Sequence, residues 1–80
     1  MKMQADRFLD ITHLVCPVTY VKVSIVLDEL EEGQILEIRM NAGEPIQNVP
    51  RSLKEDGHKI RQVIENADGT FTVFAEKGDL

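Results

Sequence analysis

A single cysteine followed directly by a proline is the part of this sequence best suited to nucleophilic chemistry. Cys16-Pro17 opens a stretch, 17–31, whose apolar residues recur at helical spacing. A helix that begins there brings the positive end of its dipole, and the expected free amides of Val18 and Thr19, to the sulfur. Such positions lower the pKa of a thiol from about 8.5 toward 7 or below. Thr19, three residues after the cysteine, is a candidate hydroxyl donor to the same sulfur.

The alternative for Cys16 is a purely structural role. An unpaired cysteine is often a small buried apolar residue, and Leu14, Val15 and Val18 around it allow that interpretation. Position alone gives the two interpretations equal weight. The sequence has one cysteine, so an internal disulfide and a Cys-x-x-Cys redox cycle are both excluded.

The two histidines offer little support for a hydrolase or a metal centre. His13 lies three residues before Cys16 and is a candidate base, but no third group to orient it is evident, so we expect a solvated loop residue. His58 follows Gly57 at an expected helix exit and receives the same interpretation. One cysteine and two histidines without paired spacing are too few for a typical metal site. We expect neither a metal nor a cofactor.

A small basic island, Arg51 to Lys54, is a further candidate for the surroundings of the cysteine. Both predicted helices start on the same side of the predicted sheet, which could bring Arg51 and Lys54 near the Cys16 turn. Two basic residues on a helix are more often ordinary exposed side chains than part of a functional site, and this is the favoured interpretation of Arg51 and Lys54. The acidic run 28–32 is interpreted as a solvated helix end.

The elements that must position these residues follow from hydrophobic periodicity. Short alternating runs predict strands at 8–11, 34–40, 60–65 and 70–75, and Asp68-Gly69 indicates a hairpin between the last two. Helical spacing predicts a first helix over 17–31, with Gly33 as its C-terminal cap.

The second helix carries Ile46, Val49 and Leu53 at helical spacing and stops at Gly57. Pro50 falls inside this pattern. It either lies in the first turn, with Asn48 as the cap, or kinks a longer helix.

The resulting order, β-α-β-α-β-β, predicts a two-layer α/β sandwich in which two helices cover one face of a four-stranded mixed sheet. Eighty residues fit one domain, 1–80. The net charge of −5 argues against direct nucleic-acid binding, and no apolar run approaches the roughly 20 residues of a membrane span. We expect a cytoplasmic, reduced, monomeric protein.

The sequence resembles the small sulfur carriers of the TusA/SirA-like family. The resemblance begins in 9–17, where an aspartate precedes a Cys-Pro turn that opens the first helix. It continues through Glu32-Gly33-Gln34, Asn48-Val49-Pro50, the Gly57-His58 helix exit and Glu76-Lys77-Gly78. It covers nearly the whole chain and implies the same two-layer α/β sandwich.

The resemblance implies that Cys16 carries sulfur as a persulfide and that Pro17 is the first proline of the family's Cys-Pro-x-Pro motif. The implied donor is a cysteine desulfurase or a rhodanese, and the implied acceptor is a DsrE-type or other protein. The implied pathways are tRNA thiolation, molybdenum cofactor assembly and sulfur oxidation. The sequence departs from the family pattern in four places: Thr19 replaces the second proline, Val15 an arginine, His13 the glycine of the upstream loop, and Asn41-Ala42 an acidic pair.

Two other functions remain open on the sequence. One is a binding or regulatory module in which the cysteine is incidental. The other is a redox protein that forms mixed disulfides through Cys16 with a partner.

Overall fold

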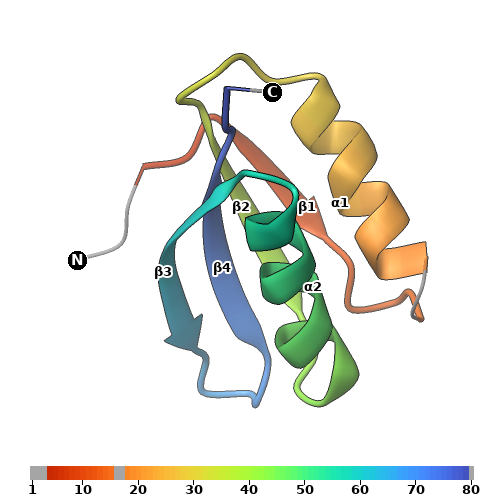
Figure 1. The fold of residues 1–80 in the computed structure, drawn as a ribbon. Helices are drawn as coiled ribbons and strands as arrows, with labels where there is room; N and C mark the ends of the chain where they lie inside the picture. Colours follow the sequence, from red (N-terminus) through yellow and green to blue (C-terminus); the bar gives the residue numbers. More distant parts are fainter. Residues whose placement is uncertain (1–3, 16–17, 80) are drawn as a thin grey trace.

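The computed structural model describes residues 4–15 and 18–79, and it shows two helices packed on one face of a four-stranded sheet (Figure 1). The elements, in chain order, are β1 (Arg7–Asp10), α1 (Val18–Asp28), β2 (Ile35–Met40), α2 (Glu44–Glu55), β3 (Lys59–Glu65) and β4 (Phe71–Glu76). Both the order of elements and the two-layer α/β class agree with the prediction from the sequence.

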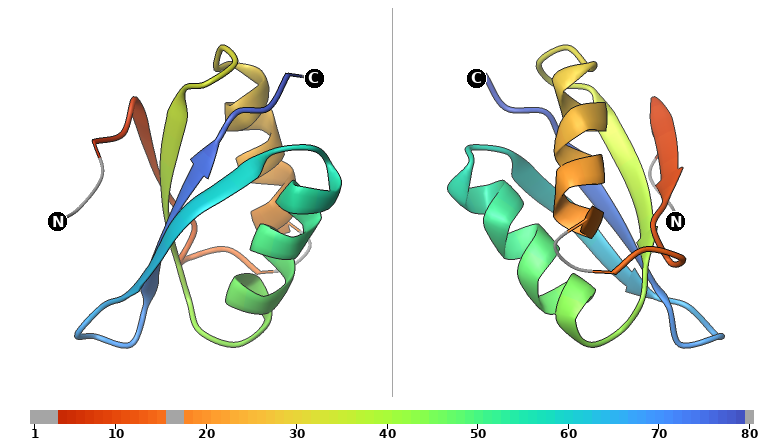
Figure 2. Two further views of the ribbon diagram at one scale, coloured as in Figure 1. Left: turned by 60° about the vertical axis from the view of Figure 1, so that its left-hand side comes forward. Right: turned by 90° about the vertical axis from the view of Figure 1, so that its right-hand side faces the viewer.

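The sheet has the order β1-β2-β4-β3 and is mixed. β1 runs parallel to β2, while β4 runs antiparallel to both β2 and β3. Parallel strands require a crossover connection, which α1 provides between β1 and β2. Side views show both helices on the same side of the sheet (Figure 2). The chain leaves the C-terminal ends of β1 and β2 to enter a helix, so α1 and α2 both start toward the same end of the sheet.

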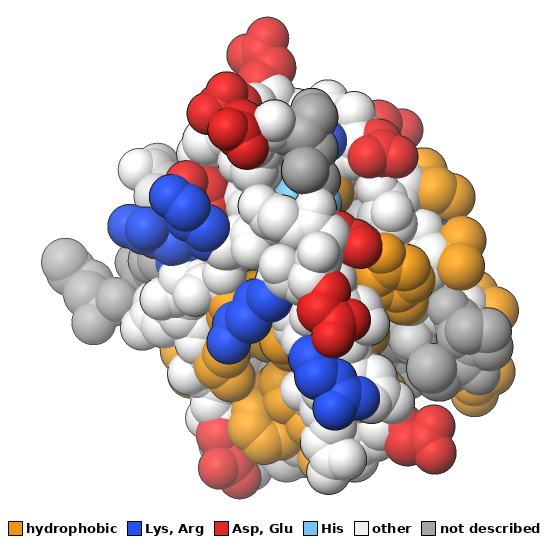
Figure 3. Space-filling view, in the orientation of Figure 1, with side chains coloured by type: hydrophobic (Ala, Val, Ile, Leu, Met, Phe, Trp, Pro, Cys, Tyr) orange, Lys and Arg blue, Asp and Glu red, His pale blue; other side chains and the backbone are white. Residues whose placement is uncertain are grey.

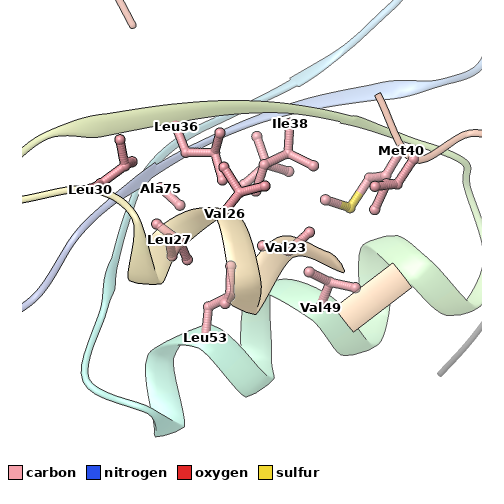
Figure 4. Close-up of a cluster of buried hydrophobic side chains, with 12 residues drawn as sticks. Val23, Val26, Leu27, Leu30, Leu36, Ile38, Met40, Val49, Leu53 and Ala75 are labelled. Carbon is pink, nitrogen blue, oxygen red and sulfur yellow. The ribbon is translucent and has the colours of Figure 1, made fainter. Parts of the chain in front are cut away.

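The hydrophobic core lies between this sheet face and the two helices (Figure 4). The predicted alternation in β2 is confirmed, because Leu36, Ile38 and Met40 are fully buried. Val23 and Leu27 of α1 are buried against them. Each buried aliphatic side chain contributes about 1.5–3 kcal/mol through loss of contact with water, so this layer holds α1 and the segment before it on the sheet.

Helix α1 is shorter than the predicted helix over 17–31 and ends at Asp28. Its end is tightened by bonds from the Glu29 amide to the Val26 carbonyl and from the Leu30 amide to the Leu27 carbonyl, both 3.0 Å long. The acidic run that follows opposes the helix dipole at a C-terminus, which disfavours a longer helix. Gly33 is therefore not the helix cap. It lies in the next turn, at φ 89°.

Helix α2 resolves the two alternatives for Pro50 in favour of the longer helix. It begins at Glu44, after Gly43, and continues through Pro50 to Glu55. Asn48 therefore lies inside the helix and is not its cap. The predicted stop at Gly57 is confirmed: its φ is 103°, and its amide donates to the Lys54 carbonyl at 3.1 Å.

Candidate functional site

The loop that leads from β1 toward Cys16 is fastened to the sheet at successive residues. Ile11 is buried and continues the ladder, with its amide 2.9 Å from the Arg39 carbonyl. The Thr12 amide and hydroxyl both donate to Asp10 Oδ1, at 2.9 and 2.7 Å. These two hydrogen bonds lower the pKa of the Asp10 carboxyl. The Leu14 amide then donates to the Ile11 carbonyl at 3.1 Å and closes a turn.

Asn41 is a second anchor of this loop, and the sequence analysis did not single it out as a site residue. Its side-chain Nδ2 donates to the Thr12 carbonyl at 2.7 Å, which ties the end of β2 to the turn after β1. An amide can donate this bond, whereas a carboxylate can only accept. Asparagine in place of the family's acidic residue therefore fits its role here. The signal was visible only as a departure from the family pattern.

The start of α1 differs from the expectation for the Val18 and Thr19 amides. Both amides donate to the Val15 carbonyl, at 2.9 and 3.3 Å. They are already engaged within the backbone, so the prediction that they are free to face the sulfur is wrong. The helix dipole remains, because it arises from the peptide units of the whole helix. Cys16 and Pro17 themselves lie outside the described residues.

The structure places Thr19, the candidate hydroxyl donor, in the interior of the molecule. It is fully buried, and its Oγ1 has no hydrogen-bond partner among the residues described. A buried hydroxyl without a partner costs about 1–3 kcal/mol, so such groups are rare in folded proteins. This atom lies in the first turn of α1, three residues after the cysteine in the sequence.

The remaining candidates, His13, Arg51 and Lys54, are all at the surface. His13 is exposed in the approach loop, as expected for a solvated residue. Arg51 and Lys54 are both exposed on α2. The Tyr20 hydroxyl donates to the Asp56 carboxylate, which raises the pKa of Tyr20. This bond places the end of α2, which carries Lys54, beside the first turns of α1.

His58 is not the solvated residue that its position at a helix exit suggested. It is buried, and its Nδ1 accepts a hydrogen bond from the Gly78 amide at 3.1 Å. Burial, together with the positive charge of Lys77, lowers the pKa of His58. A Cβ atom at Gly78 would lie 2.1 Å from the Gly57 carbonyl oxygen, so the two chain segments meet at van der Waals limits. This close approach of distant residues removes His58 from solvent.

Two further observations concern only residues 4–15 and 18–79. In these ranges no three His, Cys, Asp or Glu side chains come together as a metal site. No helix within them is long and apolar enough to cross a membrane.

Comparisons with known proteins agree with this architecture. The sequence pattern of the family described as "Sulfurtransferase TusA" matches residues 7–77. A relative from Archaeoglobus fulgidus is 28% identical over 95% of this chain and 86% of its own length. One from Bacillus subtilis is 30% identical over 82% of this chain and 88% of its own. Both are named "putative sulfur carrier protein".

A solved structure shares the fold. The crystal structure of a SirA-like protein from Desulfitobacterium hafniense superimposes with a TM-score of 0.79 at 22% identity. The match covers 91% of this chain and 99% of that protein. At this level of identity the likeness concerns the fold alone.

Proposed function

The chain belongs to the TusA family, and on that premise we propose that it is a sulfur carrier that holds sulfur as a persulfide on Cys16. One observation of the structure supports the proposal independently of the family match. The residues on either side of Cys16-Pro17 are at the surface, with Val15 75% and Val18 48% exposed, where a helix begins. A thiol in such a segment is open to partners and close to the positive end of a helix dipole.

The chemistry requires only thiol exchange. The Cys16 thiolate attacks the terminal sulfur of a donor persulfide, the S–S bond of the donor breaks, and the donor leaves as a thiolate. Cys16 then carries the persulfide. An acceptor thiolate attacks the terminal sulfur in turn, and the Cys16 thiolate is released. Neither step changes the overall oxidation state, so the transfer runs without an added oxidant or a cofactor.

Thr19 supports this role as a positioning residue in the proposal. Its buried Oγ1, without a partner among the described residues, supplies a hydroxyl that donates to the Cys16 sulfur. A hydrogen bond to the charged form stabilises the thiolate and lowers the thiol pKa. A proline at position 17 restricts its own φ to a value that suits the first position of a helix, which supports the same role.

Arg51 and Lys54, both exposed on α2, are available to a docked partner. His13, in the loop between β1 and α1, is also exposed and available to a docked partner. The proposed donor is a cysteine desulfurase or a rhodanese, and the acceptor is a DsrE-type or similar protein. A reducing cytoplasm would keep the thiol free between transfers.

Intact mass spectrometry tests the proposal. The protein is incubated with a cysteine desulfurase and L-cysteine, and the wild type should gain the mass of one or more sulfur atoms, reversibly on reduction. Cys16→Ser should gain none, and a Ser variant that labels like the wild type would refute the role of Cys16. A disulfide between the two proteins in place of the added sulfur would instead favour redox exchange.

A further inference from the structure

Helix α1 is apolar on the side that faces away from the core as well as on the side that faces it. Val23, Val26 and Leu27 are buried against the sheet and α2. On the outer side Val18, Val21 and Ile25 are 48%, 50% and 52% exposed, and Val15 just before the helix is 75% exposed. We call Val15, Val18, Val21 and Ile25 the α1 stripe.

The α1 stripe is continuous along the helix. Residues 18, 21 and 25 follow the i, i+3, i+7 spacing of a single helix face. At 1.5 Å per residue they extend over about 10 Å, and Val15 prolongs the row past the helix start. The space-filling view shows hydrophobic side chains gathered over α1 at the right of the molecule (Figure 3). Exposed apolar side chains that cluster in this way mark interaction surfaces.

The charges near the α1 stripe distinguish it from the rest of the surface. The chain contains 14 acidic residues, yet none lies between Val18 and Leu27. Lys22 is the one charged residue in that range, and it is exposed beside Val18 and Ile25 on the helix surface. Asp28 and Glu29 follow Ile25 by three and four residues and border the stripe at the end of the helix, where they pair with Lys77 and Arg7. The surface is therefore suited to a partner that is apolar and carries a carboxylate facing Lys22.

The size of the α1 stripe favours a transient partner over a second copy of the chain. Four aliphatic side chains, 48% to 75% exposed, offer on the order of 300–400 Å² of mostly apolar area. A stable dimer buries about 800 Å² on each partner. The stripe alone is too small for such a dimer, but it suits an encounter that must release after each transfer.

We propose that the α1 stripe is the docking surface for the protein that delivers sulfur to Cys16; this inference rests on the function proposed above. The stripe passes on both sides of Cys16-Pro17 in the sequence, through Val15 and Val18. A partner that covers both of these residues therefore contacts the chain immediately before and after Cys16-Pro17 in the sequence. The delivering protein presents an apolar patch, with a carboxylate at its edge, around its own persulfide.

The test compares a protein donor with a small one. The variant Val21→Ser/Ile25→Ser removes half of the α1 stripe without touching the core, and Val63→Ser on β3, where the side chain is 48% exposed, is the matched control. The protein donor is a cysteine desulfurase with L-cysteine, and the small donor is inorganic polysulfide. We expect loading by the desulfurase to slow at least about tenfold in the double variant, as for truncated interface anchors. Loading by polysulfide, and both rates in Val63→Ser, should stay at the wild-type value.

Three results would overturn the inference. The first is an unchanged desulfurase rate in the double variant. The second is an equal loss with both donors, because the stripe would then act on the thiol and not on docking. The third is a wild-type dimer at micromolar concentration, by sedimentation, that the double variant abolishes, because a second copy would then occupy the stripe. A wild type that gains no sulfur from either donor would refute the proposed function itself, which is a distinct outcome.

Discussion

The buried hydroxyl of Thr19 allows a test in which a structural role and a chemical role give different results. If Oγ1 has no partner, then Thr19→Val exchanges an unsatisfied hydroxyl for a methyl group of similar size. That change removes a penalty of about 1–3 kcal/mol and should raise the free energy of unfolding. If Oγ1 donates to the Cys16 sulfur, the same change withdraws a hydrogen bond from the thiolate.

The expected effect on the thiol follows from the energy of one hydrogen bond. A net contribution of about 0.5–1.5 kcal/mol, at 1.36 kcal/mol per pKa unit, raises the pKa of Cys16 by about 0.4–1 unit in Thr19→Val. The thiolate absorbance as a function of pH measures this shift directly. Loading by inorganic polysulfide below the pKa should slow to a corresponding degree, because less thiolate is present.

Thr19→Ser provides the matched control. It keeps the hydroxyl and removes a methyl group from a fully buried side chain, which costs about 1 kcal/mol of stability. We expect this variant to unfold at a lower temperature but to keep the wild-type pKa of Cys16. An unchanged thiol pKa in Thr19→Val, together with increased stability, would refute the proposed bond to sulfur and leave Thr19 as a core residue.

Other contacts give three further predictions. Asn41→Asp removes the donor to the Thr12 carbonyl, and we expect a loss of about 1–2 kcal/mol in denaturant unfolding; an unchanged midpoint would show that the bond does not anchor the loop. His58 is buried with a lowered pKa, so the unfolded chain binds the proton first as pH falls. Stability should therefore decrease below about pH 6.5, the unfolded value, until the pH reaches the folded pKa. His58→Asn keeps an acceptor for the Gly78 amide and should flatten this dependence; equal slopes in the two proteins would contradict the assignment. Gly78→Ala brings a Cβ atom against the Gly57 carbonyl and should cost about 2 kcal/mol or more in thermal unfolding, whereas a neutral effect would show that the two segments separate easily.

The sequence by itself predicted the type and order of the helices and strands, and which side chains of β2 and of α1 share a face. Alternation predicted the strand whose Leu36, Ile38 and Met40 are buried, and helical spacing in 17–31 predicted the helix whose Val23 and Leu27 are buried. Gly57 marked the end of α2. These features are local, because the period of a strand or a helix fixes which side chains share a face.

The tertiary structure decided what depends on residues far apart in the chain. The bond from Asn41 to the Thr12 carbonyl spans 29 positions, and the bond from the Gly78 amide to His58 spans 20. No local pattern encodes either of them: the first needs β1 to pair with β2 across the α1 crossover, and the second needs the register of the β3–β4 hairpin to bring its two outer ends together. The same holds for the Thr19 hydroxyl, whose burial follows from packing α1 on the sheet. Whether a polar side chain in an otherwise apolar helix is buried, and whether it has a hydrogen-bond partner, depends on the elements that pack against that helix.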